Sequence, residues 1–322
     1  MKRRGKSSRR KPLLSFIGAG SVGTAFATAL QSRGYRIQSV ISLKSDSAKR
    51  MARRVKAPSA SIRLEDLARE SEVIFITTPD QSIAPTASAL SRMDQFNFSK
   101  MIFVHTSGAL GSELLSPLAK KGAHVLSLHP IQLFPRKAKP RDLARRLSGI
   151  YFGVEGDAVG LAAGKKLVRD IGGRALLIRE ELKPLYHVAC VVASNYLVAL
   201  MSLLEEVYSK LSVQDGKFMN VFEKLIGSTI DSVRTTSPRD ALTGPIERGD
   251  VNTIRLHLKE LNRALPYLVP FYTVMGMETI RLAVKKGSLT TKQAAVLLDA
   301  MSNYIRREAP SELLAHYQDH KN

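Results

Sequence analysis

Three glycines near the amino end have a spacing that could bind a phosphate chain. Gly18, Gly20 and Gly23 follow the short apolar run 13–17 and precede an alanine-rich stretch of helical character over 24–33. This is the G-x-G-x-x-G pattern in a strand, turn and helix, where the first N–H groups of the helix bind a pyrophosphate. We expect Gly18 to permit the tight turn, Gly20 to leave room for the diphosphate and Gly23 to let the helix approach the strand. The pattern predicts dinucleotide binding, with an ordinary glycine turn as the alternative.

The residues about twenty positions beyond these glycines indicate which dinucleotide would bind. NAD-binding proteins commonly place Asp or Glu there to bind the ribose 2′-hydroxyl. This chain has Lys44 and Ser45, which suit a 2′-phosphate, and we expect Asp46 to cap a helix over 48–54. NADP is therefore the expected cofactor and NAD the alternative. The predicted cofactor-binding residues are Gly18, Ala19, Gly20, Ser21, Val22, Gly23, Lys44, Ser45, Thr78, Pro79 and Ser107.

A second group of polar residues lies on a long apolar helix predicted over 184–211. At 100° per residue, His187, Asn195 and Ser202 fall within one arc of about 100°, together with Ser194. Buried polar side chains need hydrogen-bond partners, so this stripe either faces a cleft or lies in a seam between helices or protomers. We favour the cleft.

Reduction of a C=O or C=N bond by a nicotinamide needs a separate proton donor close to the accepting atom. His187 could donate that proton, and Asn195 could orient the polarised group. Lys183 is the alternative donor, or an anchor for a substrate carboxylate. Arg248, in the loop 243–250, could also bind a carboxylate or could be an exposed loop charge. The predicted catalytic residues are His187, Asn195 and Lys183, the substrate-binding residues are His129, Ser194 and Arg248, and no metal site is expected.

Strands and helices alternate over the first half of the chain. This alternation predicts an α/β domain with a doubly wound, mostly parallel sheet, whose ligand crevice lies at the carboxyl ends of the strands. We expect the polar clusters Thr78/Asp80, Thr106/Ser107 and His129/Gln132 to gather there. The predicted strands are 13–17, 36–43, 73–77, 101–104, 125–128, 150–154 and 175–178.

From Pro184 onward the pattern is helical throughout. The predicted helices are 184–211, 216–233, 251–264, 267–285 with a bend at Pro270, and 291–307. We therefore expect a basic disordered tail over 1–12, an NAD(P)-binding Rossmann domain over 13–181 and a helical substrate-binding and dimerisation domain over 182–322.

The charge and the cysteine content limit which partners and which cellular compartment we expect. The 322-residue chain has 49 Lys and Arg against 28 Asp and Glu, a formal net charge of +21. The tail could be a solvated segment or a weak, salt-sensitive arm for nucleic acid or anionic lipid, and we favour the solvated segment. Cys190 is the single cysteine, which favours a reducing compartment and a cytoplasmic location.

Two further features have plain structural interpretations. The apolar run 188–204 contains Ser194, Asn195 and Ser202, so we expect a buried core helix and no membrane span. His316 and His320 lie one helical turn apart near the carboxyl end, where we expect a solvated surface and no metal site.

These motifs together resemble a family with a Rossmann-like first half and a helical domain of unknown function. That family lies in the 6-phosphogluconate-dehydrogenase-like superfamily, with ketopantoate reductase and pyrroline-5-carboxylate reductase as relatives. The resemblance implies NADP binding, reductase activity and dimers built through the helical domain. If Asn195 matches the last asparagine of the ketopantoate reductase helix, His187 stands in place of its lysine and Val191 in place of its middle asparagine. The motifs that carry the resemblance are the residues 18–23, 78–80, 105–110, 129–132, 186–187, 194–200, 242–246 and 248–250.

The sequence thus predicts an NADPH-dependent oxidoreductase that transfers hydride to a small carbonyl or imine substrate, with or without a carboxylate. The alternatives are a non-catalytic NADP-binding sensor or scaffold and an accessory protein that binds nucleic acid or lipid through residues 1–12. The expected partners are a small-molecule substrate and a second copy of the chain.

Overall fold

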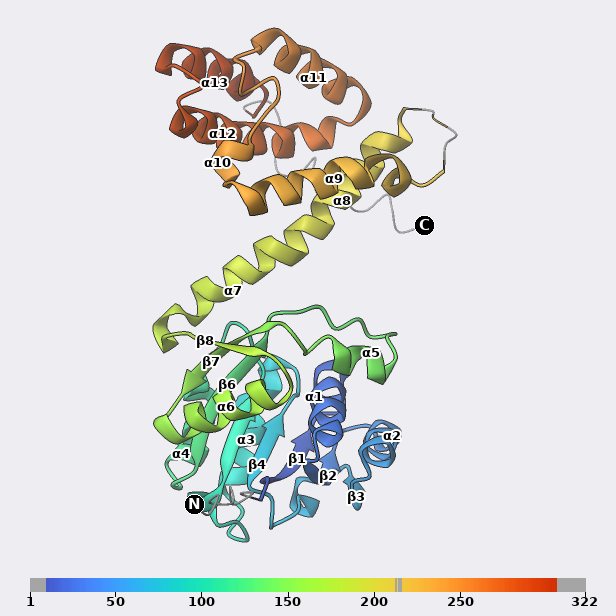
Figure 1. Cartoon of the computed structure of the whole chain (residues 1–322), viewed down its shortest axis with the longest axis vertical. Helices are drawn as coiled ribbons and strands as arrows, with labels where there is room; N and C mark the ends of the chain where they lie inside the picture. Colours follow the sequence, from blue (N-terminus) through green and yellow to red (C-terminus); the bar gives the residue numbers. More distant parts are fainter. Residues whose placement is uncertain (1–9, 212, 214–215, 306–322) are drawn as a thin grey trace, which may run out of the picture. The chain divides into compact units, whose positions relative to one another are not determined.

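The computed structural model describes residues 10–211, 213 and 216–305, which form two units (Figure 1). The first extends to Tyr196 and the second begins at Leu197. His316, His320 and most of the expected basic tail lie outside the described residues. Arg10 and Lys11, which we expected in that tail, contact the first unit: Arg10 pairs with Glu72, and the ammonium of Lys11 lies 4.7 Å from the centre of the Tyr35 ring.

The first unit is built on one sheet, as the alternating pattern predicted, with eight strands in place of the seven expected (Figure 1). Its strand order is β3-β2-β1-β4-β5-β6-β7-β8, which places the first strand at the centre. The strands are β1 (Leu13–Ile17), β2 (Arg36–Ile41), β3 (Ser59–Ser61), β4 (Val73–Ile76), β5 (Ile102–His105), β6 (His124–Pro130), β7 (Tyr151–Gly156) and β8 (Arg174–Leu177).

One neighbouring pair departs from the parallel pattern. β7 runs antiparallel to β6, with His129 opposite Gly153, and then pairs in parallel with β8. The sheet is therefore mostly parallel, as predicted, with one antiparallel pair. The segment between β6 and β7 holds only the short helix α5 (Pro140–Arg145), so the chain makes no crossover of the kind that joins parallel neighbours.

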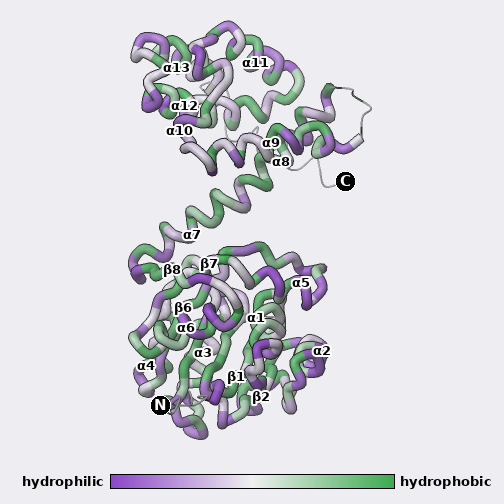
Figure 2. Tube along the Cα trace, viewed as in Figure 1, coloured by the Kyte–Doolittle hydropathy of each residue, from purple (hydrophilic) through white to green (hydrophobic). Residues whose placement is uncertain are grey.

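Helices cover both faces of the sheet. On one face, Phe16 and Phe75 stack with ring centres 4.7 Å apart under α1 (Ser21–Ser32), α2 (Ser45–Val55), α5 and α6 (Ala158–Asp170). On the other, Ile74 and Ile76 pack against α3 (Ile83–Ser91) and α4 (Ser116–Ala119). Because both faces are buried, the central strands are mainly apolar (Figure 2), with a few buried polar residues such as Ser15 in β1 and Ser127 in β6.

In the second unit the described residues form helices and connecting loops with no strand, as predicted. Its core joins Ile254, Leu258 and Ile280 with Leu297 and Met301. The expected bend at Pro270 is wrong, because this proline lies in the first turn of its helix, where it is tolerated. The helices are α8 (Leu197–Ser209), α9 (Phe218–Thr235), α10 (Pro238–Ala241), α11 (Val251–Ala264), α12 (Val269–Lys286) and α13 (Thr291–Ile305).

The long apolar helix differs from its prediction in two ways. It begins as α7 (Lys183–Val191) and passes through a π-helical turn, Val192–Tyr196, before α8. A π turn holds more residues than an α turn, so the constant 100° step that defined the polar stripe does not hold beyond Val191. The helix is also not a buried core helix: the exposed fractions are 55% for Val188, 52% for Val192 and 64% for Val198. Figure 2 shows the apolar character of this segment.

By length and composition, the helical segment Glu180–Ser209 could cross a membrane, and it is the one such segment in the described parts of the chain. Its first turns nevertheless pack onto the sheet of the first unit through Lys183, Tyr186 and His187.

Candidate functional site

The three glycines of the fingerprint have three different surroundings. Gly18 has a φ of +107°, and a Cβ there would lie 2.6 Å from the carbonyl carbon of Thr77. A Cβ on Gly23 would lie 2.4 Å from Oγ1 of Thr77, so only glycine lets α1 approach the neighbouring strand this closely. A Cβ on Gly20 would meet no atom within 4 Å. Gly20 therefore borders open space, at the residue that precedes the first turn of α1.

A pocket of about 480 Å³ opens beside this turn, at the carboxyl ends of β1, β2 and β4. Six of the predicted cofactor-binding residues line it: Gly18, Ala19, Gly20, Lys44, Thr78 and Pro79. None of its lining residues is acidic. No side chain caps the first turn of α1, and Oγ1 of Thr78 is buried without a partner. Unused N–H groups and a spare hydroxyl beside an acid-free pocket fit a phosphate-bearing ligand.

The pocket also has residues that the sequence did not predict. Ser42 and Ser47 flank Lys44, while Ile62 and Leu64 contribute apolar surface suited to a planar ring. Ile62 and Leu64 could not be predicted from a sequence pattern, because they lie beside the short strand β3, which was not among the predicted strands. The remaining predicted cofactor residues, Ser21, Val22, Gly23, Ser45 and Ser107, are not among the lining residues. α2 begins at Ser45, so Asp46 lies within its first turn and is not the cap that we expected.

Two polar clusters that follow neighbouring strands are joined directly. Oγ of Ser107, after β5, donates to the Asp80 carboxylate, after β4, over 2.7 Å and accepts from the N–H of Leu110. Below them, His105 is fully buried: its Nε2 bonds the carbonyl of Gly111 at 2.8 Å, and its Nδ1 accepts from the N–H of Ser107. Burial lowers the pKa of His105 to about 4, so this imidazole is neutral. The gathering of polar residues at this edge of the sheet is confirmed.

Two histidines meet over Gly108, just beyond β5. A Cβ on Gly108 would lie 2.9 Å from Nε2 of His129 and 2.9 Å from Nε2 of His187. The two ring centres are 5.9 Å apart. His129 belongs to β6, and its Nδ1 lies 2.7 Å from the hydroxyl of Tyr186. Residues far apart in the sequence therefore converge on one glycine.

Lys183 lies behind this pair and has no exposed surface. Its Nζ donates to Oγ of Ser127 over 2.8 Å and to the carbonyl of Ser107 over 3.2 Å. Burial lowers its pKa to about 8, and the negative charges of Glu155 and Glu113 act in the opposite direction. This ammonium ties the first turn of α7 to β6 and to the loop after β5.

Burial also sets the protonation of the neighbouring rings. It lowers the pKa of His129 to about 4, with further lowering from the charge of Lys183 and from His187. Burial raises the pKa of the Tyr186 hydroxyl above its ordinary value. At neutral pH His129 is therefore an uncharged imidazole beside a protonated tyrosine. Tyr186 was not a predicted site residue, although it precedes His187 in one of the quoted motifs.

The other predicted site residues do not join this cluster. Ser194 and Asn195 fall in the π-helical turn, and Asn195 is exposed. Arg248 belongs to the second unit, where its N–H donates to the carbonyl of Gly244, and the nearby Asp250 caps α11. Roles for these three residues in substrate binding stay predictions.

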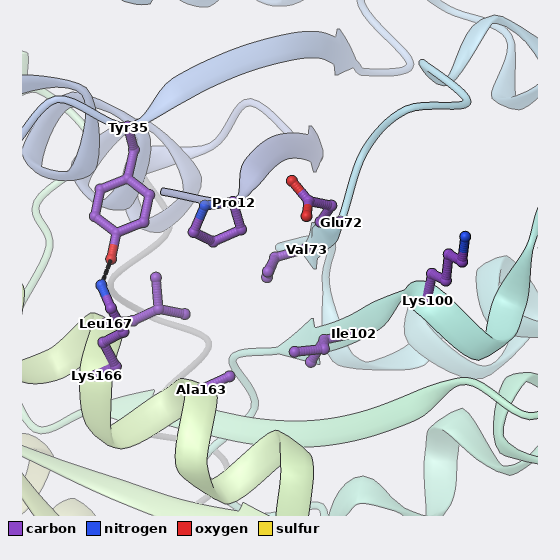
Figure 3. A pocket seen from close by; sticks show the side chains of 9 residues that line it. All are labelled: Pro12, Tyr35, Glu72, Val73, Lys100, Ile102, Ala163, Lys166 and Leu167. Carbon is purple, nitrogen blue, oxygen red and sulfur yellow. Dashed lines mark hydrogen bonds between the residues drawn. The ribbon is translucent and has the colours of Figure 1, made fainter. Parts of the chain in front are cut away.

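A second, smaller cavity of about 180 Å³ lies near the amino-terminal ends of β4 and β5 (Figure 3). Its polar groups already have partners: the hydroxyl of Tyr35 bonds Asp170 and Lys166, and Glu72 accepts from the N–H of Leu13 and from Arg10. Figure 3 shows Lys100 pointing away from the cavity. This edge of the sheet is the wrong one for a ligand of a doubly wound fold.

The fold and the glycine turn are those of a Rossmann-type domain. Residues 3–130 match the model of a Rossmann-like domain, and residues 150–279 match that of a domain of unknown function, DUF2520. The chain therefore has the two-domain composition that its motifs predicted.

Solved structures with this fold include known reductases. A candidate NADP oxidoreductase from Bacteroides fragilis is 23% identical over 84% of this chain and 98% of its own, with a TM-score of 0.69. The protein TM1727 from Thermotoga maritima is 28% identical over 85% and 97%, with a TM-score of 0.63. An imine reductase variant from Myxococcus stipitatus, solved with NAD⁺, is 15% identical over 92% and 94%, with a TM-score of 0.54. A search of curated proteins finds no match to this sequence.

Proposed function

We propose that the protein is an NADPH-dependent oxidoreductase that transfers hydride to a small carbonyl or imine substrate. The observation that carries this proposal is the open space at Gly20, beside an acid-free pocket at the same sheet edge as the two histidines over Gly108. The open space at Gly20 suits a diphosphate, and the two histidines suit proton transfer. The reductases named above share the fold and support the same chemistry.

Different residues of the first unit would bind different parts of the dinucleotide. The N–H groups at the start of α1 would bind the pyrophosphate, and the apolar wall of Ile62 and Leu64 would contact the adenine. Thr78 would offer its unpaired hydroxyl to the ligand. The bound nicotinamide would supply the hydride. NADP is favoured over NAD because Lys44 lies between Ser42 and Ser47 at the position where NAD-binding proteins place a carboxylate.

His187 is the proposed proton donor. Its ring lies against Gly108 and is partly exposed, so it can reach both substrate and solvent. Lys183, the alternative, has no exposed surface, and two oxygens hold its ammonium. We therefore assign Lys183 the task of positioning α7. Asn195, Ser194 and Arg248 remain proposed substrate-binding residues.

We further propose that the protein is a cytoplasmic homodimer. The exposed apolar side chains of Leu185, Val188 and Val192 along one helix support a partner of the same kind. The lone Cys190 supports a reducing compartment.

Cofactor titration tests the proposal. NADPH should bind more tightly than NADH, and Lys44→Met should weaken NADPH binding about 10-fold while leaving NADH unchanged, because one phosphate contact is worth roughly 1–2 kcal/mol. Lys49→Met is the matched control: Lys49 is an exposed lysine of α2, the helix that Lys44 precedes, and lies outside the pocket lining, so its loss should have little effect. Failure of both nucleotides to bind would refute the proposal, and an equal loss for both in Lys44→Met would refute the preference for NADP.

A further inference from the structure

The surroundings of His129 indicate which of its two ring nitrogens carries the proton. The hydroxyl of Tyr186 lies 2.7 Å from Nδ1, with the two rings edge to face at 85°. This hydroxyl occupies the space above Gly153, where a Cβ would lie 2.5 Å from it. Gly153 is the partner of His129 in the β6–β7 ladder. The sheet itself therefore holds the tyrosine hydroxyl against the histidine ring.

The direction of this hydrogen bond follows from what else surrounds the hydroxyl. Two acceptors lie near the phenolic proton of Tyr186: Nδ1 of His129, 2.7 Å from the hydroxyl, and the thiol of Cys190. Sulfur is a weaker acceptor than an imidazole nitrogen. Tyr186 therefore donates to Nδ1, and the neutral His129 carries its own proton on Nε2.

Nε2 of His129 is available to a ligand. Within residues 10–211, 213 and 216–305 no hydrogen-bond partner of this atom is found, and the atom keeps some solvent-accessible surface. Nε2 of His187 lies at the same distance from the Cβ position of Gly108. The two Nε2 atoms are therefore at most about 5.8 Å apart (twice 2.9 Å), so one acceptor atom between them could contact both.

We propose that these two histidines bind the oxygen of a carbonyl group, so that the substrate is an aldehyde or ketone and not an imine. This inference rests on the proposed reductase function. A carbonyl oxygen has two lone pairs and can accept from both rings at once. The nitrogen of an iminium ion, the form of an imine that accepts hydride readily, has no lone pair and so cannot accept from either ring.

The chemistry balances with the groups present. The carbonyl carbon gains the hydride supplied by the reduced nicotinamide, which is oxidised, and the C=O π bond breaks toward oxygen. His129 stabilises the growing negative charge on that oxygen through its Nε2–H and keeps its proton. His187 transfers a proton to the oxygen, giving an alcohol, and regains one from water.

Histidine NMR tests the hydrogen-bond pattern without any turnover. In the full chain labelled with ¹⁵N-histidine, His129 should show the Nε2–H tautomer at pH 7, and Tyr186→Phe should give a mixture of tautomers. Tyr272→Phe is the matched control, because Tyr272 bonds Nδ1 of His257 at the same 2.7 Å and with the same 85° ring angle in the second unit. This control should change His257 and leave His129 as it is. A proton on Nδ1 of His129 in the unchanged protein would overturn the proposal.

A substrate comparison tests the chemical class. With NADPH, small aldehydes and ketones should be reduced at least 10-fold faster than cyclic imines. His129→Ala should lower kcat about 100-fold or more, as for loss of a donor to a developing oxyanion, and Tyr186→Phe about 10-fold, with NADPH affinity unchanged in both. Tyr272→Phe should match the unchanged protein. Faster reduction of imines would overturn the carbonyl assignment but leave the reductase standing, whereas absent binding of NADPH and NADH would refute the reductase itself.

Discussion

At the scale of single residues, the glycine fingerprint shows that one residue type can be required for different reasons. Gly18 is required by its backbone conformation and Gly23 by a neighbouring strand, whereas Gly20 borders only empty space. The first two therefore belong to the fold and the third to the ligand. Substitution can separate these roles.

Gly23→Ala and Gly20→Ala form a matched pair one turn apart. The added methyl group at position 23 would meet backbone and side-chain atoms within 2.5 Å, so we expect a loss of roughly 1–3 kcal/mol of stability, as for an overpacked core. At position 20 we expect little change in stability and at least 10-fold weaker binding of NADPH. Thermal unfolding and cofactor titration of both variants measure this. Equal effects of the two variants on stability would contradict it.

The buried histidines make stability depend on pH. His105 and His129 have pKa values of about 4 in the folded chain, against an ordinary value near 6.5. Between these values the unfolded chain binds protons that the folded chain does not, so stability is fully present above pH 6.5 and is lost as the pH falls toward 4. For the fully buried His105, the loss from pH 6.5 to pH 5 is up to roughly 2 kcal/mol.

Urea unfolding of the first unit at pH 7, 6 and 5 measures this dependence. His105→Gln should flatten the curve over this range, because one of the two groups responsible is then absent. A transition midpoint that stays constant from pH 7 to pH 5 in the unchanged protein would show that these histidines titrate normally.

The sequence was most informative about residues that follow a local pattern. The glycine turn and the position of Lys44 could be predicted because neighbours in the chain determine them. Tyr186 could not, because its role depends on the antiparallel pairing that sets Gly153 opposite His129. The burial of Lys183 was equally hidden, since its partners lie 56 and 76 positions earlier in the chain.

At the scale of elements, α6 is anchored to the sheet by Asp157, the residue that precedes it. Asp157 caps the helix by accepting from the N–H of Gly160, and its second oxygen accepts from the N–H of Val125 in β6. These bonds lower the pKa of the carboxyl group, although its partial burial acts in the opposite direction. One side chain therefore joins a helix start to a strand.

Replacing this cap should destabilise the first unit. Asp157→Ala should cost about 1–2 kcal/mol, the usual penalty for losing an N-cap. Asp157→Asn, which keeps an oxygen acceptor, should lose less. Chemical unfolding of the two variants gives the comparison, and equal losses would mean that the carboxylate charge matters more than the cap.

Most elements were predicted because their apolar patterns are long and regular, whereas those missed are short. β3 has three residues and little apolar character, and it pairs only with β2. The π-helical turn was missed for another reason: its sequence, Val192 to Tyr196, is compatible with an ordinary α-helix.

At the scale of the whole molecule, the two-part organisation was foreseeable from the change of hydropathy period near Pro184, which marks the end of the strands. The exposure of the long helix was not foreseeable. An apolar pattern indicates a surface that needs a partner, but it does not say whether that partner lies in the same chain.

The proposed homodimer supplies such a partner, and its prediction concerns assembly. Val192→Glu should shift the protein toward monomers in sedimentation velocity, because a charge would then enter an apolar interface. Val159→Glu introduces the same charge at an exposed valine of α6 and should leave the assembly unchanged. A protein that is monomeric at all concentrations before mutation would exclude the dimer.

The reversed direction of β7 has a consequence for how firmly the tyrosine can be held. A strand parallel to β6 would reach the His129 end of the sheet with its last residues, where chains fray into loops. The reversed strand brings Gly153 there instead, two residues after its start and between β6 and β8, facing His129 on one side and Leu176 on the other. Gly153, which lies beneath the ring of Tyr186, is thus paired on both sides within the sheet. Its amide hydrogen should be among the slowest of the chain to exchange with deuterium.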